Sequence, residues 1–382
     1  MQVLRPTTIA ELAQALRDAA ARKQKFALAG GGSKARMGGP APETGFGITT
    51  TGLDRLIEYE PRDLTISVEA GMPWRTLCSI TAERGQMAPL DPALPGSATV
   101  GGVVAAGMSG PRRRLYGSAR DQVIGMQCIT LAGEVIQSGG MVVKNVAGYD
   151  LQKLMTGSLG TLAALASVNF KLAPIPPASA TFALAYDTLE DAAAARNSVL
   201  TGALQPSALD LLNPAAAAAA GLVEAWVLLV RAGGSARVLD RYQRELPGAS
   251  RLEGDAESRL WTWVEDFAPA SVAADPAAVV VRAAFPLQAL EPVMALAPAA
   301  AVARAGNGLA WLACPNAPTA AALVKPLTGA GASAILEWTG AGTPASLERW
   351  PDPGPSLELM RDLKNLFDPQ GLMNPGRLHG RI

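Results

Sequence analysis

The sequence predicts an α+β protein of two domains, and three observations lead to this prediction. Its 382 residues are too many for one ordinary hydrophobic core. Segments with the period of helices alternate with short runs rich in β-branched residues, so neither element type dominates. A proline-rich stretch, APIPPASA at 173–180, interrupts this alternation and marks a domain boundary. We therefore expect one domain at 1–175, a smaller α+β domain at 181–335, and a C-terminal helix and tail at 336–382.

The first domain is expected to open with a helix from Thr8 to Arg22, because Thr8 and Glu11 have the spacing of a capping box and apolar residues repeat on one face. Runs of β-branched or apolar residues predict three strands. A second helix is predicted between a proline at its start and a glycine at its end. The strands are KFALAG (25–30), GFGITTTGL (45–53) and DLTISVEAG (63–71), and the helix is PWRTLCSITAERG (73–85).

The next stretch, ALPGSATVGGVVAAGMSG at 93–110, consists almost entirely of small residues and valines. It is neither a good helix nor an alternating strand. Such a loss of side-chain bulk indicates that something large lies against the backbone. The alternative is a packed turn rich in glycine and alanine.

Two strands around an Ala-Gly turn are predicted at 121–140, followed by a helix from Asp150 to Met155, a glycine-rich turn and an apolar strand that reaches Leu172. The second domain is rich in alanine, with Pro214 at the first turn of a helix. Its clearest strands are EAWVLLVRA (224–232) and AAVVVRAAF (277–285), and the chain ends with an amphipathic helix and a tail punctuated by proline and glycine (357–382).

Composition excludes several classes of protein. Lys plus Arg and Asp plus Glu number 33 each, so the charge gives no sign of binding to nucleic acid or to a charged membrane. No apolar run suits a signal peptide or a membrane-spanning helix. We therefore expect a cytoplasmic protein, associated with a membrane only through partner subunits.

Cysteine and histidine are both scarce. Cys78, Cys128 and Cys314 lie far apart, which argues against a disulfide framework and an iron–sulfur cluster held by this chain, and we interpret Cys78 and Cys128 as core residues. The single histidine, His379, stands close to the C-terminus, where a histidine is commonly exposed and inert. Any histidine base, metal cluster or histidyl-flavin bond must use this residue, so we predict no metal.

The segment FALAGGGSKARMGG at 26–39 has the form of a strand that enters a phosphate-binding loop. A Walker A loop requires Gly-Lys followed by Ser or Thr, whereas here Ser33 precedes Lys34. A Rossmann loop opens a helix, which Gly38-Gly39-Pro40 would end at once. What remains is a nest of backbone N–H groups suited to an anion.

Four motifs in this order resemble the vanillyl-alcohol-oxidase (PCMH-type) family of FAD-binding proteins. Within that family they are most similar to the E-type FAD-binding subunits of bacterial glycolate oxidase, and GPRRR and KNVAGYDL favour this type over the larger paralogue. The motifs are GGGSKARMGG (30–39), GSATVGGVVAAGMSGPRRRLYGSARDQVIG (96–125), KNVAGYDLQKLMTGSLGTL (144–162) and DPQGLMNPGRL (368–378). The resemblance implies a PCMH-type FAD-binding domain of two subdomains, a reduced cap domain, and a tail that packs back on the FAD domain.

The resemblance also implies which residues contact a non-covalently bound FAD. The pyrophosphate loop offers Gly30, Gly31, Gly32, Ser33 and Lys34. The small-residue segment that passes the isoalloxazine and ribose offers Gly96, Ser97, Gly101, Gly102, Val103 and Ala106, with Tyr116, Gly117 and Val123 after it. Gly160 and Leu165 are implied near the adenosine, Lys144, Asn145 and Tyr149 near the flavin, and Asn374 in the returning tail.

Three of these residues have an ordinary alternative. Lys34 could face solvent, Lys144 could belong to a simple helix entry, and Asn374 could be a turn residue.

Catalytically competent hydroxy-acid members of this superfamily carry several histidines in the substrate domain, whereas residues 181–335 contain none. The catalytic residues therefore stay unassigned. We expect a subunit that holds FAD and transfers electrons in a glycolate dehydrogenase complex, with the substrate site mainly in the paralogous D subunit and an iron–sulfur F subunit beside it. The alternatives are a structural or assembly subunit with a vestigial flavin site, and a free-standing flavin-dependent hydroxy-acid dehydrogenase.

Overall fold

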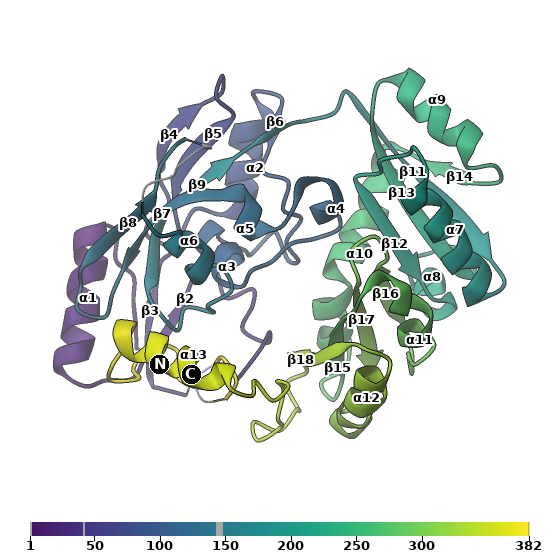
Figure 1. The fold of residues 1–382 in the computed structure, drawn as a ribbon. Helices are drawn as coiled ribbons and strands as arrows, with labels where there is room; N and C mark the ends of the chain where they lie inside the picture. The colour runs from purple at the N-terminus through teal and green to yellow at the C-terminus, as the bar shows by residue number, and fades with distance from the viewer. Residues whose placement is uncertain (1, 41–42, 143–147, 381) are drawn as a thin grey trace. The chain divides into compact units, whose positions relative to one another are not determined.

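The computed structural model describes residues 2–40, 43–142, 148–380 and 382. The chain forms two compact units. Unit 1 comprises residues 1–109, 117–175 and 352–382, and unit 2 comprises residues 110–116 and 176–351. The predicted mixture of helices and strands is confirmed, because both units combine sheets with covering helices (Figure 1).

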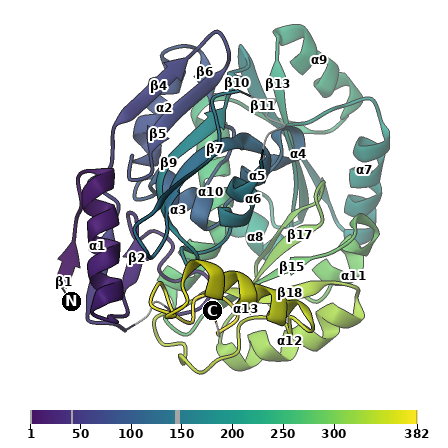
Figure 2. The same cartoon turned by 60° about the vertical axis from the view of Figure 1, so that its left-hand side comes forward.

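One layer of unit 1 is a three-stranded parallel sheet in the order β1-β3-β2, covered by α1 (Figures 1 and 2). Helix α1 begins after Thr8, whose hydroxyl accepts a hydrogen bond of 3.1 Å from the Glu11 N–H. The Glu11 carboxylate in turn accepts from the Thr7 N–H at 2.7 Å, one residue earlier than the capping-box spacing predicts. The elements are β1 (Gln2–Leu4), α1 (Ile9–Ala21), β2 (Ala27–Ala29) and β3 (Phe46–Thr49).

The second layer of unit 1 is a five-stranded antiparallel sheet in the order β4-β5-β9-β7-β8. One of its faces is apolar, where Ile66, Val168 and Phe170 are fully buried, and it packs against Trp74 of α2 and Val103 of α3. The strands are β4 (Leu56–Glu60), β5 (Thr65–Glu69), β7 (Val123–Ile129), β8 (Val135–Gly139) and β9 (Ala164–Lys171), and the helices are α2 (Trp74–Ala82), α3 (Val100–Ala105), α5 (Ala119–Gln122) and α6 (Leu151–Met155). A short antiparallel pair, β6 (Gln86–Met87) and β10 (Ala173–Pro174), lies beside them.

Unit 2 is built on an eight-stranded sheet in the order β14-β11-β13-β12-β16-β17-β15-β18, all of whose pairs are antiparallel. Alternate residues of β13 face opposite cores: Leu228 and Val230 contact one core, and Val227 and Leu229 contact the other. The strands are β11 (Ala178–Tyr186), β12 (Ala208–Leu212), β13 (Trp226–Gly234), β14 (Ser250–Leu252), β15 (Val279–Ala284), β16 (Ala301–Arg304), β17 (Leu309–Cys314) and β18 (Ser333–Thr339).

Helices cover both faces of this sheet. Side chains of α7, α9, α11 and α12 belong to the first core, and those of α8 and α10 belong to the second. The helices are α4 (Arg113–Tyr116), α7 (Leu189–Thr201), α8 (Pro214–Ala219), α9 (Ala236–Glu245), α10 (Gly254–Ala274), α11 (Leu290–Met294) and α12 (Ala317–Gly329). As predicted, Pro214 stands at the first turn of α8, where its missing N–H costs no hydrogen bond.

The structure differs from the sequence expectations in three places. Residues 100–105, for which no helix was expected, form α3, because Thr99 caps the segment and its hydroxyl accepts from the Gly102 N–H at 3.3 Å. The return to unit 1 comes at residue 352 rather than 336, because β18 pairs with β15 in the sheet of unit 2. The final helix is α13 (Ser356–Phe367). Residues 110–116, which were expected in the first domain, belong to unit 2.

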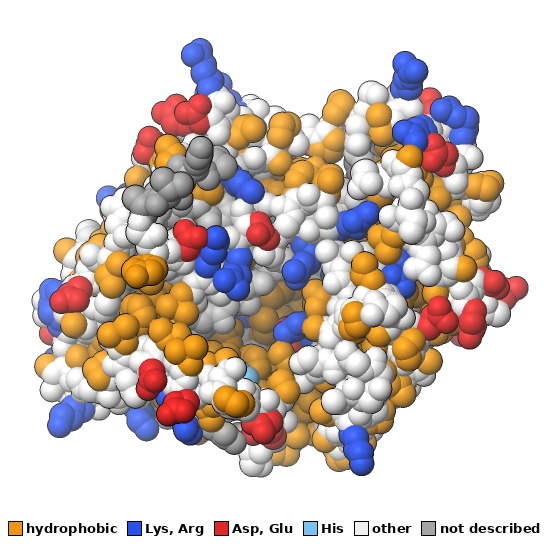
Figure 3. Space-filling view, in the orientation of Figure 1, with side chains coloured by type: hydrophobic (Ala, Val, Ile, Leu, Met, Phe, Trp, Pro, Cys, Tyr) orange, Lys and Arg blue, Asp and Glu red, His pale blue; other side chains and the backbone are white. Residues whose placement is uncertain are grey.

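Both signs of charge occur at the surface of each unit on the face shown in Figure 3, in keeping with the balanced composition. Among the described residues no helix is long and apolar enough to cross a membrane.

Candidate functional site

A pocket in unit 1 is bordered by segments that lie far apart in the sequence. They are β2 with the glycine loop (27–35), α3 with the residue on each side of it (99–106), the turn before β9 with the start of that strand (159–165) and the C-terminal tail. The structure thus brings together more than half of the residues predicted to hold the cofactor. The predicted residues that line the pocket are Gly30, Gly31, Gly32, Ser33, Lys34, Gly101, Gly102, Ala106, Gly160, Leu165 and Asn374.

The hydrogen bonds of the glycine loop are strongly asymmetric. Within the described part of the chain, the N–H groups of residues 30–33 donate to no acceptor. Two carbonyl groups of the same loop do have donors: the Thr49 hydroxyl reaches the Gly30 carbonyl at 3.3 Å, and the Ala35 N–H reaches the Gly32 carbonyl at 3.0 Å. Consecutive unpaired N–H groups beside a cavity form a site for an anion.

The glycines of this loop are required by its packing as well. A Cβ atom on Gly30 would lie 2.0 Å from the Thr99 hydroxyl oxygen, and one on Gly31 would lie 2.0 Å from the Ser97 carbonyl oxygen. Gly32 has φ +74°, a conformation that favours glycine. The loop therefore packs directly against Ser97 and Thr99, which immediately precede α3, and side chains at positions 30 and 31 would not fit there.

Lys34 is buried, so its alternative reading as a solvent-facing lysine is wrong. Its side chain is 7% exposed, and its ammonium group donates to the Ser33 hydroxyl at 3.0 Å and to the Ala93 carbonyl. Lys34 and Arg377 are the two charged side chains among the described residues that line the pocket, and both are cationic. This balance favours an anionic ligand.

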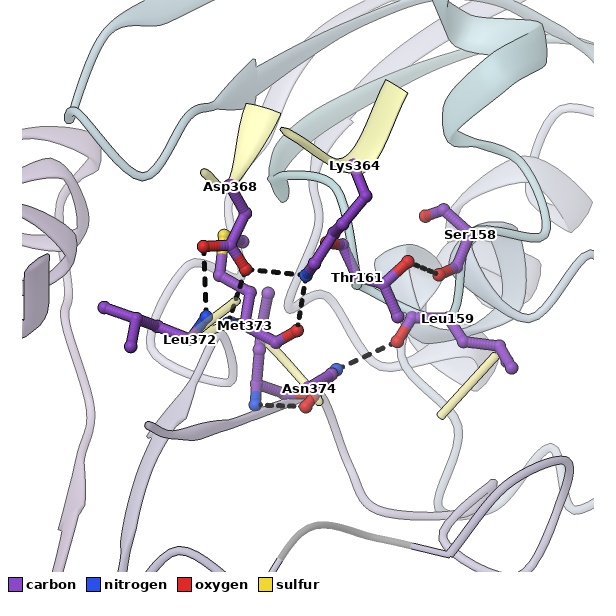
Figure 4. A network of polar contacts seen from close by, with 9 residues as sticks. Ser158, Leu159, Thr161, Lys364, Asp368, Leu372, Met373 and Asn374 are labelled. Atoms are coloured by element: carbon purple, nitrogen blue, oxygen red, sulfur yellow. Dashed lines mark hydrogen bonds and ion pairs between the residues drawn. The ribbon is translucent and has the colours of Figure 1, made fainter. Parts of the chain in front are cut away.

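Asn374 joins the tail to two walls of the pocket (Figure 4). Its side-chain oxygen accepts from the Leu28 N–H at 2.8 Å, and its side-chain nitrogen donates to the carbonyls of Leu28 at 3.0 Å and Leu159 at 2.9 Å. The backbone of Asn374 has φ +44°, and its N–H donates to the Phe26 carbonyl at 3.1 Å. Asn374 therefore does sit in a turn, but its amide extends the hydrogen bonding of β2 and holds the turn before β9.

The tail is fixed further by a buried ion pair. The Lys364 ammonium donates to the Asp368 carboxylate at 2.6 Å and to the carbonyls of Thr161 at 2.6 Å and Met373 at 3.0 Å (Figure 4). Asp368 also accepts from the Met373 N–H at 2.8 Å. Burial lowers the pKa of Lys364, and the Asp368 carboxylate partly opposes that shift. These contacts hold the tail against the turn that precedes β9.

The other predicted contacts among the described residues do not line this pocket. The Ser97 carbonyl packs against Gly31 of the loop, and the side chains of Val103 and Val123 are buried in the core beneath the five-stranded sheet. Tyr149 is 91% exposed. Tyr116 belongs to unit 2, and Gly96 and Gly117 lie outside the lining, while Lys144 and Asn145 fall outside the described residues. Their roles toward the cofactor stay predictions.

Sequence reasoning missed Arg377, Thr99 and Thr50, which also line the pocket. The signal for Arg377 was present, because it directly follows the NPG of the tail motif. Thr99 could have been found as the residue that precedes an apolar helical run. Thr50 carries no signal beyond its place after a β-branched strand.

No group of three or more His, Cys, Asp or Glu side chains that could hold a metal is present in the described ranges. Cys128 is buried as expected, and burial raises its pKa to about 11. Cys78 is exposed on α2, so its interpretation as a core residue was wrong.

Comparisons with known protein families agree with a cofactor-binding role for this pocket. Residues 1–150 match the family described as FAD binding domain, and residues 352–378 match that of FAD linked oxidases, C-terminal domain. This chain has the fold of a PCMH-type FAD-linked oxidase. The family resemblance and the FAD cofactor predicted from the four motifs are confirmed.

Several proteins of known name are similar to part of this chain in sequence. The chain is 40% identical over 169 residues to glycolate oxidase subunit GlcE of Escherichia coli, which covers 44% of this chain and 48% of the relative. It is 30% identical over 177 residues to glycolate oxidase subunit GlcD of Bacillus subtilis (46% and 38%). It is also 30% identical over 185 residues to D-2-hydroxyglutarate dehydrogenase of Xanthomonas citri (48% and 39%). The matched part thus spans less than half the length of each of these relatives.

The fold extends over nearly the whole chain. A structure of alkyldihydroxyacetonephosphate synthase matches 98% of this chain and 75% of its own with a TM-score of 0.71 at 15% identity. At this identity the likeness shows the fold alone, which confirms the predicted PCMH-type architecture.

Proposed function

We propose that this chain is an FAD-dependent oxidoreductase subunit that takes part in oxidation of the CH–OH group of small 2-hydroxy acids. The observation that carries the proposal is the row of four N–H groups at residues 30–33 that have no acceptor among the described residues, on a loop within the segment that matches FAD-binding domains. The relatives named above as glycolate oxidase subunits and D-2-hydroxyglutarate dehydrogenase support hydroxy-acid oxidation as the reaction class.

The residues of the pocket fit FAD in three respects. The N–H groups of residues 30–33 would bind the pyrophosphate, and the ammonium of Lys34 adds positive charge close to it. The apolar walls, which include Leu28, Leu159 and Leu165, would exclude water from the adenosine. Bound FAD would supply the acceptor for the two electrons of the oxidation.

We further propose that the chain is the E-type subunit of a multi-subunit glycolate dehydrogenase and transfers electrons rather than oxidising the substrate itself. Removal of a hydride from a 2-hydroxy acid requires a base for the hydroxyl proton. Unit 2 contains no histidine, and His379 belongs to the tail of unit 1. The substrate site is therefore placed mainly in the paralogous D subunit, with an iron–sulfur subunit as electron acceptor.

The test uses the full-length chain loaded with FAD, supplied with glycolate or D-lactate and an artificial electron acceptor. We expect no turnover by the isolated chain and turnover once the D-type subunit is added. Rapid turnover without a partner would contradict electron transfer as its role and would support a free-standing dehydrogenase. Failure to bind any flavin, combined with normal assembly into the complex, would support a structural subunit.

A further inference from the structure

Arg377 is the one charged side chain of the tail that lines the pocket among the residues the structure describes. It is 7% exposed, and its guanidinium donates to three carbonyl groups of the glycine loop. The acceptors are the carbonyls of Lys34 at 3.1 Å, Ala35 at 3.1 Å and Gly39 at 2.9 Å. One side chain, more than 330 residues away in the sequence, therefore binds the loop at three points.

A loop of peptide groups can attract an anion only if its carbonyl groups point elsewhere, because each carbonyl oxygen repels a phosphate as strongly as the N–H attracts it. In this loop the carbonyls of Gly30 and Gly32 are engaged by Thr49 and by a turn. The carbonyls that follow Ser33 are engaged by Arg377. A guanidinium suits this task, since its planar set of donors fixes the directions of several acceptors at once.

The backbone of the tail is also hydrogen-bonded to the glycine loop, with donors on both segments. The Gly39 N–H donates to the Arg377 carbonyl at 3.0 Å, while the Arg377 side chain donates to the Gly39 carbonyl. A Cβ atom on Gly39 would lie 2.4 Å from the Gly376 carbonyl oxygen, so the loop and the tail are in direct backbone contact.

We infer that Arg377 is a positioning residue of the cofactor site, which orients the carbonyl groups of Lys34, Ala35 and Gly39 so that the N–H groups of residues 30–33 face the pyrophosphate. Ordering of the glycine loop and docking of the tail then occur together, as one coupled equilibrium. A ligand with a diphosphate must stabilise both, because it binds only the arrangement in which they are joined. This inference rests on the proposed FAD site and extends it to the tail.

The first test replaces Arg377 by glutamine in the full-length chain and measures the dissociation constants of FAD and of ADP. ADP carries the diphosphate and adenosine but no flavin, so both ligands should lose affinity by the same factor, at least tenfold. Arg361→Gln is the matched control, because Arg361 is an exposed residue of α13 outside the pocket lining. Its dissociation constants should equal those of the wild type.

A role in positioning is separated from a merely structural one by chemical rescue. In Arg377→Ala, ethylguanidinium at millimolar concentration should restore most of the lost affinity for ADP, whereas ethylammonium should not. Restoration by neither compound, or unchanged ADP binding in Arg377→Gln, would overturn the inference.

A measurement on the wild type remains decisive if both variants fail to fold. Hydrogen exchange with and without ADP should show slower exchange in peptides that cover residues 26–40 and also in peptides that cover residues 368–380. Protection of the loop without protection of the tail would contradict the coupling. If the wild type binds neither FAD nor ADP, the proposed cofactor site itself fails, which is a different outcome from binding that does not depend on Arg377.

Discussion

Gly31 shows how a single residue can serve both packing and ligand binding. Replacement by alanine would place a Cβ atom 2.0 Å from the Ser97 carbonyl oxygen, so the loop would have to leave the residues that cap α3. We expect Gly31→Ala to weaken FAD binding by more than tenfold, measured by quenching of flavin fluorescence, because the unpaired N–H groups would no longer converge.

Gly329, the last residue of α12, is the control for this substitution. Nothing lies within 4 Å of the position that a Cβ atom would take there, and its φ is not positive. Gly329→Ala should leave FAD binding unchanged and raise the free energy of unfolding by up to about 1 kcal/mol. Equal effects of the two substitutions would contradict the packing of the loop that the structure shows.

The three cysteines should differ in reactivity. Burial raises the pKa of Cys128 to about 11 and that of Cys314 to about 12, whereas Cys78 is exposed. A thiol reagent at pH 8 should therefore modify Cys78 rapidly in the folded protein and the other two only on unfolding. Rapid modification of two or three thiols in the native state would contradict this assignment.

The raised pKa values of the two buried thiols also determine whether the free energy of unfolding rises or falls with pH. An unfolded cysteine loses its proton near pH 8.5, so between about pH 8.5 and pH 11 the unfolded chain binds fewer protons than the folded one. The free energy of unfolding should fall as the pH rises through this window, by up to about 1.4 kcal/mol per pH unit for each buried thiol.

At the scale of elements, the tail after α13 depends on the pair of Lys364 and Asp368. Asp368→Asn would leave the buried ammonium without its counterion and place an amide N–H group toward the N–H of either Leu372 or Met373. We expect a loss of about 3 kcal/mol in the free energy of unfolding at pH 7, measured by urea denaturation. Glu245→Gln, in the exposed pair with Arg241 on α9, should cost about 0.5 kcal/mol or less.

The loss in Asp368→Asn should shrink as the pH rises from 7 to 10. Burial lowers the pKa of Lys364 in the folded state, and removal of the carboxylate lowers it further. Lys364 then binds more protons in the unfolded chain than in the folded one over this range, so the stability of the variant rises with pH relative to the wild type. A loss independent of pH would mean that Lys364 keeps its charge without Asp368.

The sequence predicted the elements whose bounds depend on neighbouring residues and missed a helix that depends on tertiary contacts. Local signals located α1, whose start is set by Thr8, and α8, whose first turn holds Pro214. The small-residue stretch was expected to lie against something large, and it does border the pocket, but its helix α3 was missed because glycine and valine are poor helix formers. The cap by Thr99 and contacts with the sheet outweigh that propensity.

The site was predictable where it depends on backbone and not where it depends on distant side chains. The glycine loop could be recognised because a nest of N–H groups needs glycine. The tail motif includes Arg377, but its contacts could not be predicted, because its acceptors lie more than 330 residues away and are backbone carbonyl groups, which do not depend on residue type. Asn374 was named through the family resemblance, while its bonds to Leu28 and Leu159 could be known only from the fold.

At the scale of the whole molecule, three stretches of chain line the pocket inside unit 1: the N-terminal part that matches FAD-binding domains, residues 159–165, and the tail that matches the end of FAD-linked oxidases. We expect this pocket to hold FAD by non-covalent contacts alone. Single-site variants can weaken binding for many reasons, but the cofactor content of the intact chain tests this expectation without any substitution.

The measurement is the flavin content of the purified full-length chain, produced in riboflavin-rich medium and precipitated with acid. We predict about one FAD per chain, all of it released into the supernatant, and rebinding of added FAD by the flavin-free protein. A chain that carries no flavin and takes up none, or one whose flavin stays with the precipitate, would show that the pocket does not hold FAD in this way.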